Sequence, residues 1–377
     1  MRKNLFKKVL ALTLASTMAF SMAGCGSKGG SSDAKNDDGT ITLNVWHQWS
    51  NDTNELKGKY EEAVKAYEKE NSGVKIKTET LDTEAYKTKI NAEFAGDAKG
   101  IDVFYWWGAG TAKKLVDAGK VMALDDYVTD DVKSKILEGS TSAFEFDGKL
   151  YSVPMFSWYM TLFCNKTMFD KAGATLPTTY DELVDAVKKL KKLDGVTPMA
   201  AGAKDGWNAA FVYQALALRE VGATGVNEML SGKKEFGDEG FKKAAQKVSD
   251  LYEMGAFGDN PLEQGNDDAN AAFENGKAAM RLMGSWFANN VYTDDAATIK
   301  PEEVVALKIP TIADGKGEAT DYCGGFVESF WVNNNTKYKE EAAKFINYLL
   351  GGIDGKDGSA SCRSGSYNVS IPEQYGC

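Results

Sequence analysis

The first part of the chain alternates between strand-like and helix-like segments. Apolar and polar side chains alternate along residues 41–47 (ITLNVWH) and 74–80 (VKIKTET), as in strands with one buried face. Residues 101–106 (IDVFYW) are continuously apolar, which is typical of a strand in a parallel sheet. Between these segments, apolar residues recur at helical spacing: Leu56, Tyr60, Ala63, Val64 and Tyr67, and then Tyr86, Ile90 and Phe94. This order predicts an α/β fold.

Near its middle the chain is predicted to turn back on itself. Residues 147–148 (DG) predict a tight turn, because glycine adopts positive φ at no steric cost. A strand is expected over 149–153, and Pro154 should interrupt it because proline lacks a backbone donor. The apolar run 156–163 predicts a buried strand that ends at Asn165, where a short helix begins. We interpret this segment as the crossing between two lobes.

A second set of elements follows the crossing. Thr179 and Glu182 have the spacing of a capping box at the start of a helix. Further helices are predicted over 207–221, 241–254 and 339–350, and strands over 278–284, 304–310 and 326–332. A length of 377 residues suits two domains of ordinary size. We predict an N-terminal lobe from 40–153 and 312–350, and a C-terminal lobe from 154–311.

The N-terminus reads as a targeting segment. Residues 1–8 are basic, and the apolar stretch after them, about 15 residues long, is short of the ~20 that span a bilayer. Small residues before Cys25 resemble a bacterial lipobox, in which the cysteine is lipidated. This predicts a signal peptide over 1–24 and a Gly/Ser-rich tether over 25–39. The alternative is a chance thiol after an ordinary signal peptide.

Composition narrows the chemistry. The net charge is −10, and without the four basic residues of 1–24 it would be −14, which disfavours nucleic acid as a partner. His47 is the only histidine, so a histidine-based triad or multi-histidine metal site is excluded. Cysteine spacing gives no zinc or redox motif, and no cofactor is expected. With 54 acidic residues, the sequence does not exclude a pair of carboxylates that hydrolyses glycosides.

The aromatic residues are the feature of the sequence that points to a ligand. Open α/β sheets bind ligands beyond the carboxyl ends of their strands, and residues 46–52 and 105–110 form two such ends. Flat aromatic rings suit the C–H face of a sugar, and nearby amides and carboxylates suit its hydroxyls. Trp46, Trp106 and Trp331 lie inside strands, where a core role is equally compatible. The candidates at strand ends or in loops are Gln48, Trp49, Asn51, Trp106, Trp107, Asp205, Trp207 and Trp286.

Residues 40–350 resemble the family 1 extracellular solute-binding proteins, which include sugar-binding lipoproteins of ABC importers. The resemblance rests on ITLNVWHQW, IDVFYWW, DGKLYSVP with LFCNKTMFDKAG, LPTTYDEL, AFENGKAAMRLMGSW and EEAAKFINYLL, taken in order. It implies a periplasmic-binding-protein-like fold, with two α/β lobes that close over a sugar about a hinge. It also implies a monomer that is held at the outer side of the cell membrane by its lipid anchor alone. By the same resemblance, this monomer delivers its sugar to ABC permease subunits.

The resemblance also suggests site residues. Trp106 falls where the family stacks an aromatic ring on sugar, and Trp286 in the GSW motif matches a stacking position. Trp158 falls at a cleft position where an acidic residue is common. Asp205 and Trp207 fall where an acidic and aromatic pair occurs. Gln48, Trp49 and Asn51 lie at the cleft mouth, and Gly324 lies in a glycine-rich loop facing the site.

The chain departs from the family pattern at its end. The family continues with helices that complete the second lobe, whereas residues 351–377 are rich in Gly and Ser, without a helical stripe. We expect a poorly ordered or truncated tail, whose missing helices would expose apolar surface and remove one wall of the site. The main hypothesis is oligosaccharide capture without catalysis. The alternatives are a peptide or polyamine ligand, a surface glycosidase, or a purely structural surface protein.

Overall fold

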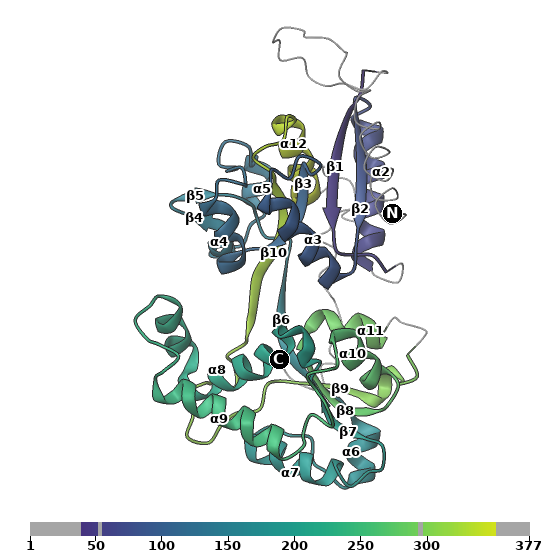
Figure 1. Ribbon diagram of the computed structural model, residues 1–377, viewed down its shortest axis with the longest axis vertical. Coiled ribbons are helices and arrows are strands. Elements are labelled where there is room, and N and C mark those ends of the chain that lie inside the picture. Colours follow the sequence, from purple (N-terminus) through teal and green to yellow (C-terminus); the bar gives the residue numbers. More distant parts are fainter. Residues whose placement is uncertain (1–38, 52–54, 293–296, 352–377) are drawn as a thin grey trace, which may run out of the picture. The chain divides into compact units, whose positions relative to one another are not determined.

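The computed structural model describes residues 39–51, 55–292 and 297–351 (Figure 1), and it confirms the α/β class. The strands are β1 (Ile41–His47), β2 (Val74–Thr80), β3 (Val103–Trp107), β4 (Glu145–Phe146), β5 (Lys149–Leu150), β6 (Phe156–Asn165), β7 (Thr197–Ala200), β8 (Ala278–Gly284), β9 (Val304–Leu307) and β10 (Gly324–Val332). The helices are α2 (Glu55–Glu70), α3 (Thr83–Ala95), α4 (Ala109–Asp117), α5 (Asp130–Ser134), α6 (Lys166–Ala172), α7 (Tyr180–Leu190), α8 (Trp207–Leu230), α9 (Glu239–Glu253), α10 (Asn266–Glu274), α11 (Ala288–Tyr292) and α12 (Lys339–Gly351). Short 3₁₀ turns are η1 (Ser142–Phe144), η2 (Ala203–Asp205), η3 (Ser285–Phe287) and η4 (Pro301–Glu303).

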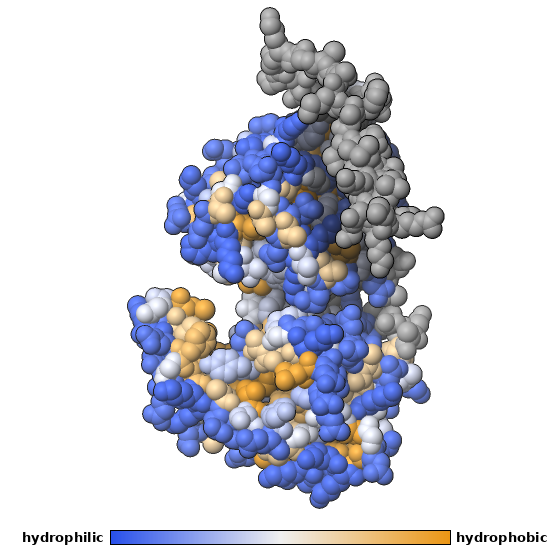
Figure 2. Space-filling model, in the orientation of Figure 1, coloured by the Kyte–Doolittle hydropathy of each residue, from blue (hydrophilic) through white to orange (hydrophobic). Residues whose placement is uncertain are grey.

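Buried apolar side chains form two separate clusters. The first draws on residues 43–155 and 330–350, and the second on residues 160–309. We call the parts of the chain around them the first lobe and the second lobe. On the face shown in Figure 2, apolar residues gather over the second lobe, whereas the first lobe is mainly hydrophilic.

The first lobe is built on the predicted alternation of strands and helices. Strands β2, β1 and β3 are parallel, and β10 joins β3 in the antiparallel sense. The predicted stripe of α3 is confirmed, because its buried residues are Tyr86, Ile90 and Phe94. The hydroxyl of Tyr86 donates to the carbonyls of Trp46 (3.1 Å) and Tyr105 (2.7 Å). One side chain thus ties α3 to β1 and β3 near their carboxyl ends.

The predicted crossing is present, with one correction. Asp147 and Gly148 have φ of 50° and 74° and connect β4 to β5 as the expected turn. The strand expected over 149–153 stops at Leu150. Ser152 is fully buried there and bonds the Phe330 carbonyl at 2.6 Å, which draws the chain toward β10 instead of extending the hairpin.

Strand β6 connects the two lobes. Its first residues, 156–159, pair with β10, and residues 160–165 pair with β8 and β9. It ends at Asn165 as predicted, where Asn165 Oδ1 accepts from the backbone N–H of Met168 (3.2 Å) and caps α6. Strand β10 is likewise shared, because its end pairs with β3. The full path can be followed in Figure 1 as β2-β1-β3-β10-β6-β8-β7, with β9 paired to β6.

The second lobe confirms the predicted capping box. Thr179 Oγ1 accepts from Glu182 N (3.3 Å), and Glu182 Oε2 accepts from Thr179 N (3.2 Å), at the start of α7. The helix predicted over 207–221 is α8, which is interrupted at Gly222 (φ 70°) and then continues to Leu230. A Cβ at Gly222 would lie 2.8 Å from the Lys316 carbonyl, so only glycine fits.

Several predicted features lie outside the described residues. They are the signal peptide 1–24, Cys25, nearly all of the tether, and the tail after residue 351 with Cys362 and Cys377. In the described part of the chain, Cys164 and Cys323 are free thiols. No helix in that part combines the length and apolarity needed to cross a bilayer.

Candidate functional site

In the first lobe, predicted aromatic residues surround a buried carboxylate. Tyr105 Oη and Trp107 Nε1 donate to the two oxygens of Glu328 at 2.6 and 2.8 Å. Burial raises the pKa of Glu328, and these two hydrogen bonds and the charge of Lys87 lower it. Trp107 is half-buried, whereas Tyr105 is fully buried. Glu328 on β10 therefore fixes the indole of Trp107 at the end of β3.

The structure places Trp49 in the core of this lobe. It is 4% exposed and makes ring contacts with Tyr60, Tyr105 and Phe330, at centroid distances of 6.1, 5.1 and 5.8 Å. Its backbone N–H donates to His47 Nδ1 at 3.2 Å. Trp49 is thus held by rings from three separate segments, and its own ring is enclosed within the core.

The other first-lobe candidates differ in exposure. Trp106 is 4% exposed, its ring lies 5.4 Å from that of Trp107, and its carbonyl accepts from Trp331 Nε1 (3.0 Å). Gln48 is half-buried and Asn51 is exposed. Two polar atoms, Trp106 Nε1 and Gln48 Oε1, are buried without a hydrogen-bond partner among the described residues.

In the second lobe, three predicted tryptophans meet around one phenylalanine. Phe211, on α8, stacks on Trp158 at 5.5 Å and contacts Trp207 and Trp286 edge-on at 5.2 and 6.1 Å. Trp158 and Trp286 also contact each other at 4.9 Å. All three tryptophans are half-buried, whereas Phe211 is 8% exposed. We call these four residues the Phe211 cluster.

Asp205 and Gly324 flank this cluster in structural roles. The carboxylate of Asp205 accepts from the backbone N–H of Asn266 at the start of α10. Gly324 has φ of 154°, and a Cβ there would lie 2.1 Å from the Trp158 carbonyl. Glycine at this position lets β10 approach β6 beside Trp158. The sequence placed both residues near the site but did not reveal these roles.

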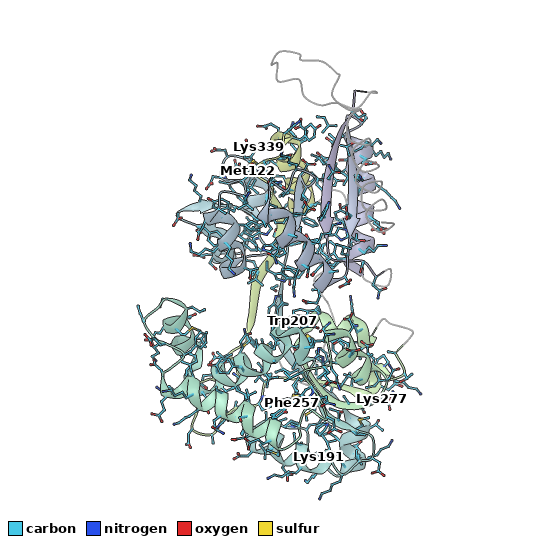
Figure 3. The ribbon with its side chains drawn as sticks, in the orientation of Figure 1. Met122, Lys191, Trp207, Phe257, Lys277 and Lys339 are labelled. Atoms are coloured by element: carbon cyan, nitrogen blue, oxygen red, sulfur yellow. The ribbon has the colours of Figure 1, made fainter. Side chains whose placement is uncertain are left out.

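Two charged residues of α3 lie between the aromatic groups. Lys87 Nζ is 5.1 Å from the ring centre of Trp107 and 5.2 Å from that of Trp207, within cation–π range. Lys87 also pairs with Glu84 at 2.8 Å, and Glu84 accepts from Trp207 Nε1 at 3.1 Å. Trp207, at the first turn of α8, is labelled in Figure 3. Trp107 and Trp207 thus share one cationic neighbour.

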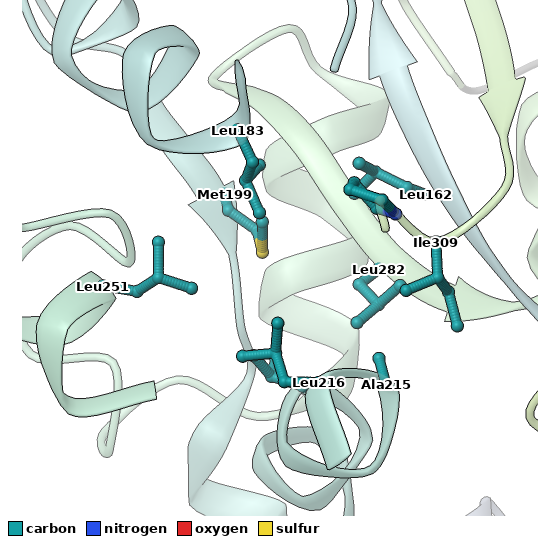
Figure 4. Close-up of a pocket in the computed structure, with 10 residues that line it drawn as sticks. Leu162, Leu183, Met199, Ala215, Leu216, Leu251, Leu282 and Ile309 are labelled. Carbon is teal, nitrogen blue, oxygen red and sulfur yellow. The ribbon is translucent and has the colours of Figure 1, made fainter. Parts of the chain in front are cut away.

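The structure also contains a small apolar cavity inside the second core (Figure 4). Its volume is about 20 Å³, which leaves room for about one water molecule. Leu162, Met199 and Leu216 are among its lining residues. A sugar ring cannot enter it. Among the described residues, no group of His, Cys, Asp and Glu could hold a metal ion.

Sequence reasoning missed several residues of this arrangement. Arg281 and Glu328 lie in strands that are otherwise apolar, AAMRLMG and FVESFWV. A charge in such a strand requires buried partners, and that requirement could have singled them out. Glu84 and Lys87 begin α3, just past the carboxyl end of β2, where the same rule that selected residues 46–52 applies. Phe211 had no local signal.

Comparison with known sequences gives the family. The sequence profile described as bacterial extracellular solute-binding protein matches residues 50–351. A multiple sugar-binding protein of Streptococcus mutans is 24% identical over 359 residues, covering 91% of this chain and 78% of that protein. An ABC transporter extracellular-binding protein of Pyrococcus horikoshii is 26% identical, over 82% of this chain and 68% of that protein.

Solved structures agree on the fold. A protein from work on xylan utilization by the thermophile Caldanaerobius polysaccharolyticus superposes with a TM-score of 0.76 at 38% identity, covering 82% of this chain and 78% of that one. A chitin oligosaccharide binding protein superposes with a TM-score of 0.71 at 23% identity, over 83% and 78%. These neighbours confirm the predicted two-lobed solute-binding fold. The chain belongs to the bacterial extracellular solute-binding protein family.

Proposed function

We propose that this protein captures an oligosaccharide outside the cell membrane and delivers it to an ABC importer. The observation that carries the proposal is the Phe211 cluster, in which Trp158, Trp207 and Trp286 are half-buried around one buried ring. Partly exposed aromatic faces bind the apolar faces of sugar rings, and a surface of several such faces suits more than one ring. Trp107, held by Glu328, is the first-lobe counterpart.

The polar groups around these rings suit hydroxyls. Glu84 and Lys87 present a carboxylate and an ammonium next to Trp207 and Trp107. Trp158 Nε1 and Trp106 Nε1 are donors without a partner in the described part of the chain. A few placed polar groups among aromatic side chains are typical of a small-molecule site. We include Gln48, Asn51, Asp205 and Gly324 as proposed residues at the edge of the site.

Relatives support a carbohydrate as the ligand class. One relative bears the name multiple sugar-binding protein, and the structural neighbour at 38% identity comes from work on xylan utilization. Xylan-derived oligosaccharides are therefore the first ligands to test. A different solute on the same fold, such as a peptide or polyamine, is the alternative.

The proposal also covers how the ligand is captured and delivered. We propose that residues 40–153 with 312–350, and residues 154–311, move as lobes about the shared strands β6 and β10 and close on the ligand. Cys25 would carry the lipid anchor, the protein would work as a monomer, and permease subunits would receive the sugar. We propose binding without catalysis, because the family is one of solute-binding proteins; in this chain Glu84 pairs with Lys87, and Asp205 accepts from the backbone at the start of α10.

Thermal unfolding of the purified protein tests the proposal. The panel contains xylotetraose, chitotetraose, maltotetraose and the matching monosaccharides, with spermidine and a tetrapeptide as non-sugar ligands. A ligand at 100 times its Kd adds about 2.7 kcal/mol, which raises Tm by several degrees. We expect a shift with one sugar class that is lost in Trp286→Ala. A shift with spermidine or the peptide alone, or sugar cleavage detected by chromatography, would contradict it.

A further inference from the structure

Arg281 is a buried cation in the middle of an apolar strand. It lies in β8, is 1% exposed, and its neighbours along the strand are all buried. Burial lowers its pKa to about 9, and the charges of Glu274, Asp205 and Asp267 act in the opposite direction. Within the described part of the chain, its hydrogen bonds go to neutral oxygens. Burying a charged guanidinium costs free energy, so we expect Arg281 to have a role beyond packing.

The bonds of Arg281 join three segments that meet near the Phe211 cluster. These segments are the end of β7, the start of α8 and the start of α10, and they flank or carry Asp205 and Trp207. The acceptors are Ala200 O (3.1 Å), Ala201 O (3.2 Å), Asn208 Oδ1 (2.6 Å), Asn266 Oδ1 (3.0 Å) and Asn270 Oδ1 (3.1 Å). One guanidinium therefore sets how these segments lie against β8.

The bond to Asn208 fixes which way its amide points. Arginine only donates hydrogen bonds, so Oδ1 of Asn208 must face Arg281 and Nδ2 must point away. Asn208 is 2% exposed, and Nδ2 has no hydrogen-bond partner among the described residues. Asn208 follows Trp207 directly and lies one helical turn before Phe211. An oriented, buried and unpaired donor therefore lies in the first turn of α8, between Trp207 and Phe211 in the sequence.

We propose that Arg281 is a positioning residue for sugar binding and that the Asn208 Nδ2 group it orients donates a hydrogen bond to an oxygen of the bound sugar. This inference rests on the proposed function, because it supplies the acceptor that Nδ2 lacks. Buried polar groups left unpaired are unfavourable, so a sugar with an oxygen at that place is preferred over one without it. Asn208 thereby contributes to selectivity.

The decisive variant is Asn208→Asp. Aspartate keeps the shape and the oxygen that accepts from Arg281, but it replaces the Nδ2 donor by a second acceptor. We expect an unchanged or higher Tm, because the new carboxylate pairs with Arg281, together with at least tenfold weaker binding of the saccharide that stabilises the wild type. Calorimetric titration with xylotetraose, chitotetraose and maltotetraose measures this.

Asn165→Asp is the matched control. It adds the same charge to the same lobe, and aspartate still caps α6. We expect its Kd to stay within twofold of the wild type. Wild-type affinity in Asn208→Asp would overturn this inference and leave the proposed function intact. A wild-type protein that binds none of the three saccharides would overturn the proposed function, and this inference with it.

A second pair of variants separates positioning from stability. Arg219 is also 1% exposed in the second lobe, but it donates to the carbonyls of Ile309, Glu318 and Asp321 and not to the start of α8 or to α10. We expect Arg219→Met and Arg281→Met both to lower Tm. Below both midpoints, only Arg281→Met should bind the saccharide at least tenfold more weakly. Equal affinities would contradict a positioning role for Arg281, and if Arg281→Met does not fold, Asn208→Asp decides.

Discussion

The two lobes hold their aromatic residues in different ways. In the first lobe, ring edges are fixed by hydrogen bonds to a buried carboxylate, as Tyr105 and Trp107 are by Glu328. In the second lobe, Trp158 and Trp286 are held by each other and by Phe211, whereas Trp207 packs on Phe211 and its indole N–H donates to Glu84 of the first lobe.

This difference suggests that the two lobes contribute in different ways to ligand binding. A ring held by a directed hydrogen bond keeps one orientation, whereas several partly exposed rings packed together offer a larger apolar contact area. We therefore expect the first lobe to set the place of one sugar ring at Trp107. The second lobe would supply most of the contact area and, through Asn208, one directed donor.

Removing the centre of the Phe211 cluster should have the largest effect. Phe211→Ala deletes a buried ring that contacts three tryptophans, and such changes cost about 3–5 kcal/mol of unfolding free energy. Urea unfolding measures the loss, and sugar affinity should fall in the folded protein. Phe236→Ala, at a side chain that is 63% exposed, should change stability by less than about 0.5 kcal/mol. Similar losses in both variants would contradict the role of Phe211.

Acid should destabilise the first lobe through its single histidine. Burial, and secondarily the charge of Lys57, lowers the pKa of His47 from 6.5 to about 3. Between these values the unfolded chain binds a proton that the folded chain does not. The free energy of unfolding therefore falls as pH drops below 6.5, by up to about 1.4 kcal/mol per pH unit.

The comparison with His47→Gln isolates this effect. Between pH 6.5 and 5, the carboxylates are largely ionised at their ordinary pKa values, so the histidine dominates the slope. Urea unfolding at several pH values should show a shallower slope for the variant. An equal slope would mean that His47 is protonated as readily in the folded protein as in the unfolded chain.

An effect of opposite sign is expected at Glu328. Its pKa is raised, first by burial, so the folded chain holds a proton that the unfolded chain releases. The stability of the wild type relative to Glu328→Gln is then highest below the unfolded pKa and decreases as pH rises through the folded one. We therefore expect urea unfolding to give a smaller stability difference between wild type and variant at pH 8 than at pH 4. A relative stability that increases with pH would show that Tyr105 and Trp107 outweigh burial.

Local patterns in the sequence predicted much of the fold. The α3 stripe, the Thr179 capping box and the end of β6 at Asn165 were correct, because spacing and capping act over a few residues. Contacts between segments that are distant in the chain could not be predicted from the sequence. Trp49 lies beside polar residues in sequence, yet its ring is enclosed by Tyr60 and Phe330 from distant segments.

The candidate site was predictable only in part. The sequence selected Trp158, Trp207 and Trp286, which the structure brings together around Phe211. The role of Phe211 was not predicted, because a phenylalanine in a helix is normally interpreted as a core residue. The short elements α4, α5, β7 and α10 were also missed, because four to nine residues carry too little periodicity to identify them.

The most direct measurement is a calorimetric titration of the purified protein with the oligosaccharide that gives the largest thermal shift. The account predicts binding of one sugar per chain with a negative heat-capacity change, because apolar ring faces are buried. It predicts that Trp286→Ala weakens the affinity at least tenfold and that Trp49→Phe leaves it within about twofold. Unchanged affinity in Trp286→Ala, or a larger loss in Trp49→Phe, would contradict a ligand surface centred on Phe211.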